Sequence, residues 1–255
     1  MMAYDLAGPA DGELVVLIHS SVADRRQWDE QWDRLSQRFR VARPDLRGSG
    51  ETPMPGGSFS YVEDVAELIE SLGGGPATIV GSSFGGRVAL STAAARPDLV
   101  RQLVLLCPAY KGVPQTPDVE AFGEREDELL EAGDVDGAVE LNVASWLGPD
   151  AGSAAADLVR TMQRRAFDVQ LAADELPDPP APSWPEIDLA RVAQPTVVFS
   201  GAHDFDWFGH IAEHLAATMP DARHVALPWA GHLPNLERPD ETTGLVLDAL
   251  SGARG

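Results

Sequence analysis

The chain has 255 residues, a length that suits one sizeable α/β domain with an insertion. Its 40 acidic and 19 basic residues give a formal net charge of −21. Because a surface this acidic repels nucleic acids and anionic lipids, we expect neither a nucleic-acid partner nor a membrane partner. The single cysteine, Cys107, excludes an intramolecular disulfide, and its place after an apolar run predicts a buried core residue.

No targeting segment and no apolar run of membrane-spanning length is evident, so the sequence predicts a cytoplasmic protein. The first part of the chain alternates between strand and helix patterns. An edge strand is expected near residues 4–6, and the apolar run 14–18 predicts a strand buried on both faces, as in a parallel sheet. Apolar residues at helical spacing over 28–39 and a short strand at 41–43 follow.

A second helix is predicted after the turn-rich loop 44–50. Ser60 and Glu63 have the spacing of a capping box, and apolar residues continue at helical spacing to Leu72. Glycines and Pro76 then end the helix. The order of strand, helix, strand, helix is typical of a parallel α/β sheet.

The motif Gly-x-Ser-x-Gly at residues 81–85 follows an apolar strand pattern and precedes a run that can be helical. A strand that turns sharply into a helix is strained, and glycines remove the Cβ atoms that would collide there. Ser83 stands at the tip of this turn, beside free N–H groups of the helix that stabilise negative charge. The context predicts that Ser83 is a nucleophile.

The alternation stops at residues 109–190, where apolar residues show helical spacing and no strand pattern appears. Five prolines between 177 and 185 then predict a stiff, extended return. We therefore expect a core formed by 1–108 and 191–255, with an all-helical lid inserted at 109–190. Beyond the lid, the patterns predict strands at 196–199 and 224–227, each followed by a helix.

A serine hydroxyl needs a base to act as a nucleophile, and that base needs an orienting acid. The carboxyl ends of parallel strands share one edge of the sheet, so residues that follow strands come together there. Asp204 and Asp206 follow one predicted strand and His232 follows the next, which gives the order Ser, Asp, His expected after such a turn. Asp206 directly precedes a predicted helix and can cap it, which favours Asp204 as the acid.

Four stretches of the chain resemble the α/β-hydrolases, and among these the 3-oxoadipate enol-lactonases and related small esterases. They are the strand that leads into His19-Ser20-Ser21, residues 45–50, residues 81–86 and residues 230–239. The resemblance implies that Ser83 is the nucleophile, His232 the base and Asp204 the orienting acid. It further implies an oxyanion hole made by the backbone N–H groups of Ser21 and Phe84. Relatives usually carry glycine where this chain has Ser20, and a Cβ restricts that loop.

These residues predict a serine hydrolase that acts on a carboxylic ester or lactone of a small molecule through an acyl-enzyme, without a cofactor or a metal. Hydrolysis of a C–C bond in a diketone and cofactor-free perhydrolysis use the same three residues and remain open. The serine at the turn argues against haloalkane dehalogenation and epoxide opening, which use aspartate in this fold. We expect a monomer or a homodimer.

Candidates for the substrate pocket are Trp28, Trp146 and Phe205, although residues at these spacings more often belong to the core. Arg164 belongs to a basic stripe on a lid helix, which is either a solvated face or a clamp for a substrate carboxylate. His19 is expected to anchor its loop.

Two other classes of function remain. His210 and His214 belong to an H-x-x-E-H sequence, which is found in zinc proteases, but no third ligand stands out nearby. A ligand-binding protein of the same fold that catalyses no reaction is the other class, and the complete set of Ser, Asp and His argues against it.

Overall fold

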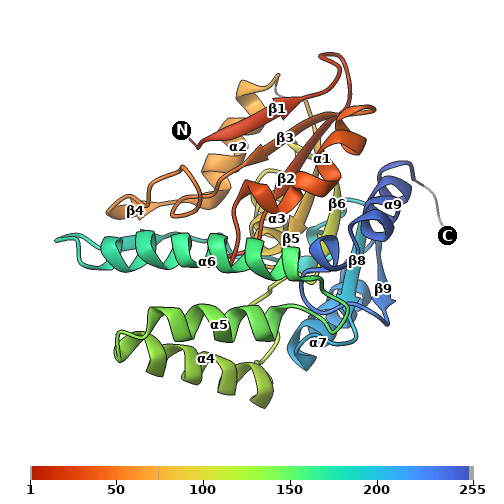
Figure 1. The fold of residues 1–255 in the computed structure, drawn as a ribbon. Coiled ribbons are helices and arrows are strands. Elements are labelled where there is room, and N and C mark those ends of the chain that lie inside the picture. Colours follow the sequence, from red (N-terminus) through yellow and green to blue (C-terminus); the bar gives the residue numbers. More distant parts are fainter. Residues whose placement is uncertain (1, 74, 253–255) are drawn as a thin grey trace.

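In the computed structural model, which describes residues 2–73 and 75–252, a seven-stranded sheet forms the centre of the molecule (Figure 1). In spatial order its strands are β1 (Tyr4–Ala7), β3 (Arg40–Pro44), β2 (Leu14–Ile18), β5 (Ala77–Ser82), β6 (Val100–Leu106), β8 (Thr196–Gly201) and β9 (Ala222–Leu227). The edge strand β1 is antiparallel to β3, and the other neighbours are parallel. This confirms the expected α/β class with a mostly parallel sheet.

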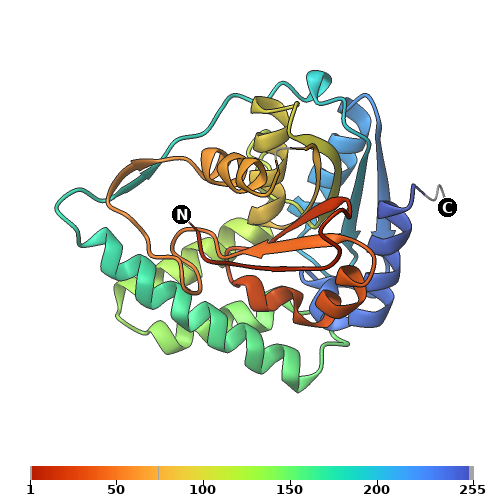
Figure 2. The same cartoon turned by 90° about the horizontal axis from the view of Figure 1, so that it is seen from above.

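Helices cover both faces of the sheet (Figure 2). One face carries α1 (Asp29–Ser36) and α9 (Pro239–Leu250), and the other carries α2 (Tyr61–Ser71), α3 (Phe84–Ala95) and α7 (Asp206–Thr218). Successive residues of β2 alternate between the two apolar cores: Val15 packs in the core beside α1, whereas Val16 packs in the core beside α2 and α3. Because side chains of a strand point alternately to opposite faces, a strand that is apolar throughout needs cover on both sides.

The register of the parallel strands brings several loops to one edge. Ser82 at the end of β5 pairs with Leu106 of β6, and Leu106 pairs with Phe199 of β8. The residues that follow these strands therefore emerge side by side at the carboxyl edge of the sheet.

Three long helices lie together beyond this edge (Figure 1). They are α4 (Pro117–Glu131), α5 (Val135–Trp146) and α6 (Ser153–Asp174), and they connect β6 to β8. No helix in the described ranges 2–73 and 75–252 is long and apolar enough to cross a membrane.

Residues 109–190 are not helical throughout, because the extended return expected at 177–185 contains a short strand. Strand β7 (Pro180–Pro182) pairs in parallel with β4 (Gly57–Phe59), and the sequence patterns indicated neither strand. The prolines do not prevent this pairing, because the backbone N–H groups of Gly57 and Ser183 donate to Asp178 and Phe59 instead. The pair joins residues 180–182 to residues 57–59, the segment that precedes α2.

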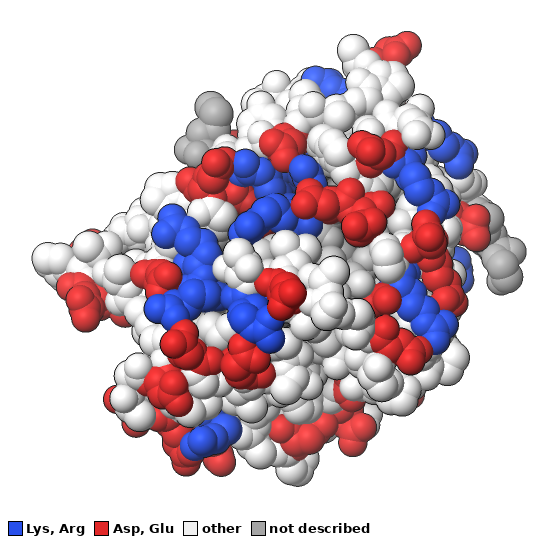
Figure 3. All heavy atoms as spheres, viewed as in Figure 1, with Lys and Arg blue, Asp and Glu red and all other residues white. Residues whose placement is uncertain are grey.

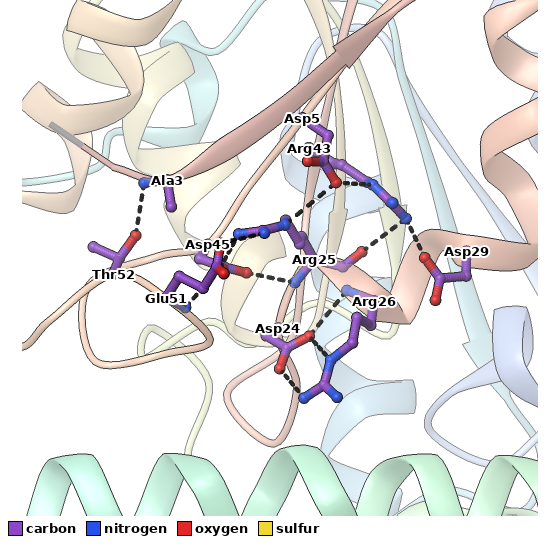
Figure 4. Close-up of polar contacts among 10 residues, drawn as sticks. All are labelled: Ala3, Asp5, Asp24, Arg25, Arg26, Asp29, Arg43, Asp45, Glu51 and Thr52. Carbon is purple, nitrogen blue, oxygen red and sulfur yellow. Dashed lines mark hydrogen bonds and ion pairs between the residues drawn. The ribbon is translucent and has the colours of Figure 1, made fainter.

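A network of ion pairs holds the loop after β3 (Figure 4). The buried carboxylate of Asp45 accepts hydrogen bonds from the backbone N–H groups of Arg25 and Glu51, each at 2.8 Å, and from the Arg25 guanidinium at 2.5 Å. Arg47, two residues further along, pairs with the largely buried Asp64. The loop is thus fixed by charge-assisted bonds on both sides of its turn.

Candidate active site

Ser83 lies between β5 and α3, at the sharp turn predicted from the motif. Its φ of 51° and ψ of −113° lie in a region that non-glycine residues rarely adopt. Three backbone bonds hold it there: its N–H donates to Leu106, and its carbonyl accepts from Arg87 and Ala109. Strain at a single residue that its surroundings enforce is common at functional sites.

The glycines of the motif permit a very close approach. A Cβ on Gly85 would lie 2.3 Å from the carbonyl oxygen of Ile18 and 2.6 Å from that of His19. A Cβ on Gly81 would lie 2.6 Å from the carbonyl oxygen of Gly85. Helix α3 therefore packs directly against the end of β2, which brings the turn at Ser83 beside the loop of His19 and Ser20.

Asp204 and His232 lie together although 28 positions separate them in the chain. Asp204 Oδ2 is 2.7 Å from His232 Nδ1, and the two side chains are 0% and 2% exposed. An aspartate in this position orients the imidazole and leaves Nε2 to face a reacting group. Within the described part of the chain, the hydroxyl of Ser83 makes no hydrogen bond to His232. Such contacts are often longer before substrate binds.

Asp206, the alternative acid, is exposed, and His232 Nδ1 pairs with Asp204 instead. Its backbone N–H donates to Asp118, and the side chain makes no capping bond. Helix α7 begins at Asp206 itself, so the expected cap by this residue is wrong; Phe205 occupies the capping position.

His232 sits among aromatic rings and is fixed by its neighbours. The rings of Trp146 and Phe208 lie with their centroids 4.5 Å and 4.2 Å from that of the imidazole. Glu237, which the sequence patterns did not single out, accepts hydrogen bonds from the backbone N–H groups of Gly231 and Leu233, on either side of His232. Burial raises the pKa of Glu237, and the bond from Gly231 opposes that rise. Its carboxyl group thus fixes the backbone at the histidine.

The backbone N–H groups of Ser21 and Phe84 have no hydrogen-bond acceptor among residues 2–73 and 75–252. Both residues line one cavity of about 270 Å³. Its walls come from the loops after β2 and β3, from the start of α2, from the turn at the start of α3, and from α6 and β7. The lining residues are His19, Ser21, Leu46, Arg47, Ser49, Met54, Tyr61, Phe84, Gln170, Asp174 and Pro180. Free N–H groups at a cavity are suited to bind an oxygen that gains negative charge.

Two of the predicted pocket residues are placed elsewhere. Trp28 is fully buried in the core beside α1 and β2, on the sheet face opposite α3, because helical spacing does not reveal which face a helix covers. Arg164 is exposed on α6 and pairs with Asp136 and Asp168. Figure 3 shows such positive groups bordered by negative ones over this face of the molecule. Both assignments to the pocket are therefore wrong.

Trp146 and Phe205 pack against each other near His232. Their rings pack edge to face with centroids 5.1 Å apart, and Trp146 contacts His232, but neither residue lines the cavity. Trp146 thus packs against the imidazole, and Phe205 packs against Trp146.

The structure does not support the zinc alternative. His210 and His214 are exposed on α7, and Tyr110 stacks on His214. Among the described residues, a single group of three His, Cys, Asp or Glu side chains has its ligand atoms within 4.8 Å of one another, namely Cys107, Asp204 and His232. The H-x-x-E-H sequence thus lacks a third ligand in the described parts of the chain.

Cys107 is buried, as predicted, but it also lies beside Asp204 and His232. It follows β6 with a φ of 45°, and its Sγ is 3.7 Å from the carbonyl oxygen of Gly231. Burial raises the pKa of the Cys107 thiol well above its ordinary value. The group therefore stays a neutral thiol next to the Asp204 carboxylate.

His19 anchors the loop after β2, as expected. Its Nε2 accepts from the backbone N–H of Leu46 at 2.9 Å, and its Nδ1 lies 2.7 Å from the carbonyl oxygen of Ser20. This pattern requires a neutral ring with the proton on Nδ1. Burial lowers the pKa of His19, in keeping with that state.

Acid should therefore destabilise the protein through His19. As the pH falls below about 6.5, the unfolded chain takes up a proton that the folded chain excludes, so the free energy of unfolding falls by up to about 1.4 kcal/mol per pH unit. Urea unfolding between pH 7 and pH 5 should show a smaller loss for His19→Asn than for the unaltered protein. Equal losses in both proteins would contradict this account.

Comparison with known proteins supports the same fold. The model of the alpha/beta hydrolase family matches residues 15–244. A hydrolase from Pseudomonas aeruginosa PA01 is 31% identical, with a TM-score of 0.78 over 98% of this chain and 94% of that chain. The enol-lactonase from Burkholderia xenovorans LB400 is 24% identical, with a TM-score of 0.77 over 98% and 96% of the two chains.

Two curated relatives differ in how much of the chain they match. The putative carbamate hydrolase RutD of Pseudomonas savastanoi pv. phaseolicola is 26% identical in an alignment of 265 positions that covers 95% of each chain. The lipase LipV of Mycobacterium tuberculosis is 41% identical over 104 residues, and the chain spans 40% of its length. The family match, the full-length similarity and the order of the strands together show that this chain belongs to the α/β-hydrolase family.

Proposed function

We propose that the chain is a serine hydrolase in which Ser83, His232 and Asp204 act as a triad. The observation that carries the proposal is the buried 2.7 Å contact between Asp204 and His232 at the sheet edge where Ser83 occupies a strained turn. Ser83 Oγ attacks the carbonyl carbon of the substrate while His232 Nε2 takes its proton, and the N–H groups of Ser21 and Phe84 bind the oxyanion. The leaving group then departs with the proton from His232.

A water molecule completes the cycle. His232 takes a proton from water, the resulting hydroxide attacks the acyl-enzyme, and Ser83 leaves with the proton as the free acid forms. The hydroxyl of the water remains on the acid product. Its other hydrogen returns to Ser83 Oγ and replaces the proton that Ser83 gave to the leaving group.

We propose a small ester or lactone as the substrate. The cavity of about 270 Å³ beside Ser21 and Phe84 has room for a small acyl or leaving group. A carbamate is the second candidate substrate, because a relative matched over 95% of the chain is named a putative carbamate hydrolase. The same acyl transfer applies to a carbamate.

We propose further that residues 109–190 form a lid over a core made of 1–108 and 191–255. Gln170 and Asp174 at the end of α6, together with Pro180 of β7, supply one wall of the cavity, whereas the core supplies the others. Substrate choice then depends on the lid as well as on the triad.

The experiment is a panel of purified substrates at neutral pH: p-nitrophenyl acetate and butyrate, an enol-lactone, an aryl carbamate, a diketone and acetate with peroxide. We expect turnover of the esters and the lactone to exceed that of the diketone and of the peroxide reaction. No turnover of any acyl substrate, or a preference for the diketone, would contradict the proposal.

A chelator separates this mechanism from a zinc enzyme. Activity on p-nitrophenyl acetate should survive exhaustive dialysis against EDTA, and a variant with His210→Ala and His214→Ala should keep kcat within about twofold, because these side chains lie on the outer surface of α7. Loss of activity on chelation with recovery on added zinc would refute the serine mechanism.

A further inference from the structure

A single buried amide connects the loops that carry the proposed catalytic groups. Gln27 lies in the short helix η1 (Arg25–Trp28) between β2 and α1, and its side chain is fully buried. A fully buried amide must find partners for all its polar atoms, because a lone N–H or carbonyl in the core costs free energy.

Each polar atom of Gln27 has a partner. Its Oε1 accepts from the backbone N–H of Ser20 at 2.8 Å, and its Nε2 donates to Ser82 Oγ at 2.9 Å and to Asn235 Oδ1 at 3.1 Å. The three partners are 7, 55 and 208 positions away in the sequence. One side chain therefore connects three separate segments.

The bonds also fix which way the amide faces. Rotating it by half a turn would set its N–H groups against the N–H of Ser20 and its oxygen against Asn235 Oδ1. Asn235 strengthens the arrangement, because its Nδ2 donates back to the carbonyl oxygen of Gln27 at 2.8 Å.

Each of the three segments carries one catalytic group. Ser20 directly precedes Ser21, Ser82 directly precedes Ser83, and Asn235 lies in α8 (Pro234–Glu237), which directly follows the loop of His232. We propose that Gln27 is a positioning residue, which holds the oxyanion loop, the nucleophile turn and the base segment at the separation that the reaction needs. This inference rests on the proposed function.

The magnitude of the expected effect follows from how sharply acyl transfer depends on geometry. A displacement of about 1 Å at the reacting groups costs about 100-fold in rate. The effect falls on the transition state, because the oxyanion forms only there, and substrate binding does not require the three loops in exact register. The hydrogen bond between Gln27 and the backbone of Ser20 also lies where this chain departs from the glycine usual in its relatives.

The test compares two buried glutamines. Gln31 is also fully buried and also contacts Asn235: its Nε2 donates to the carbonyl oxygen at 3.1 Å and its Oε1 accepts from Nδ2 at 3.3 Å. Gln31 has no hydrogen bond to Ser20 or Ser82, so Gln31→Met removes the same kind of side chain without releasing the oxyanion loop or the nucleophile turn. Both methionine variants should lower the melting temperature.

Gln27→Met should lower kcat on p-nitrophenyl acetate by about 10- to 100-fold while KM stays within about threefold. Its affinity for an aryl trifluoromethyl ketone, which mimics the tetrahedral intermediate, should fall by the same factor as kcat/KM. Gln31→Met should keep both quantities within about threefold. Equal losses of kcat in the two variants, or a lower melting temperature of Gln27→Met with unchanged kcat, would overturn the positioning role.

If Gln27→Met does not fold, a second variant tests the positioning role. Gln27→Glu keeps the size of the side chain and the acceptor for the N–H of Ser20, and loses donors to Ser82 and Asn235. Its kcat should fall, but less than in Gln27→Met, and full activity would again overturn the inference. Ser83→Ala distinguishes the two levels of the argument: if it is inactive while both Gln27 variants are fully active, only the positioning role fails.

Discussion

Ser83→Ala is expected to lower kcat on any accepted ester by about 10³-fold or more, with little change in KM. Removing one member of a triad removes the function of the unit, and only binding and the oxyanion N–H groups remain to accelerate the reaction. The variant should fold normally, since the side chain of Ser83 makes no capping bond and alanine is no more strained than serine at a φ of 51°. The measurement is kcat and KM on p-nitrophenyl acetate, with the melting temperature beside them.

Ser91→Ala is the matched control. Ser91 is also buried on α3, and its hydroxyl has no hydrogen-bond partner among the residues that the structure describes, so this variant removes a comparable hydroxyl away from the proposed site. It should keep full activity. Substantial activity in Ser83→Ala, or an equal loss in both variants, would show that the reaction does not pass through Ser83.

Asp204→Asn should lower kcat by about 10²- to 10⁴-fold and leave the fold intact. An asparagine amide facing Nδ1 favours the wrong tautomer of His232, so that Nε2 carries a proton and cannot take one from Ser83. Asp206→Asn is the control, because Asp206 is exposed two positions further along and contacts Asp118 rather than the histidine. If the losses were reversed between the two variants, Asp206 would be the acid.

The long elements of the fold were predictable because their patterns are long. The apolar run of β2 and the capping box at Ser60 gave positions that agree with the structure, where Ser60 Oγ accepts from the N–H of Glu63. The short elements β4, β7 and α8 have three or four residues each, too few to show a period. Prolines at both ends of β7 also argued against a strand, and its pairing depends on N–H groups outside those prolines.

The main residues of the candidate site were predictable from their positions after strands, since residues that follow parallel strands share one edge of the sheet. That rule leads to Ser83, to His232 and to the pair Asp204 and Asp206. The choice of Asp204 rested on a helix cap by Asp206 that the structure does not contain. The rule cannot find Gln27 or Glu237, because glutamine and glutamate normally lie on the surface. Gln27 bonds to partners 55 and 208 positions away, and Glu237 bonds to backbone N–H groups, which leave no side-chain signal in the sequence.

The wrong assignments of Trp28 and Arg164 to the substrate pocket have related causes. Helical spacing shows that Trp28 faces a core but does not show which of the two faces of the sheet that core covers. The basic residues around Arg164 suggested a carboxylate clamp because the protein is acidic overall. In the structure Arg164 forms an ion pair with Asp136, which lies 28 positions earlier on α5. Tertiary neighbours of this kind leave no local signal.

Labelling with a fluorophosphonate tests the central claim most directly. This reagent reacts with a serine only when a base and oxyanion donors activate it, so it reports the working triad rather than the presence of a hydroxyl. The unaltered protein should gain one label, and peptide mass spectrometry should locate it on Ser83; Ser83→Ala and Asp204→Asn should lose most or all of the labelling. A label on Ser82 or on any other residue, or undiminished labelling of Ser83→Ala, would contradict the account.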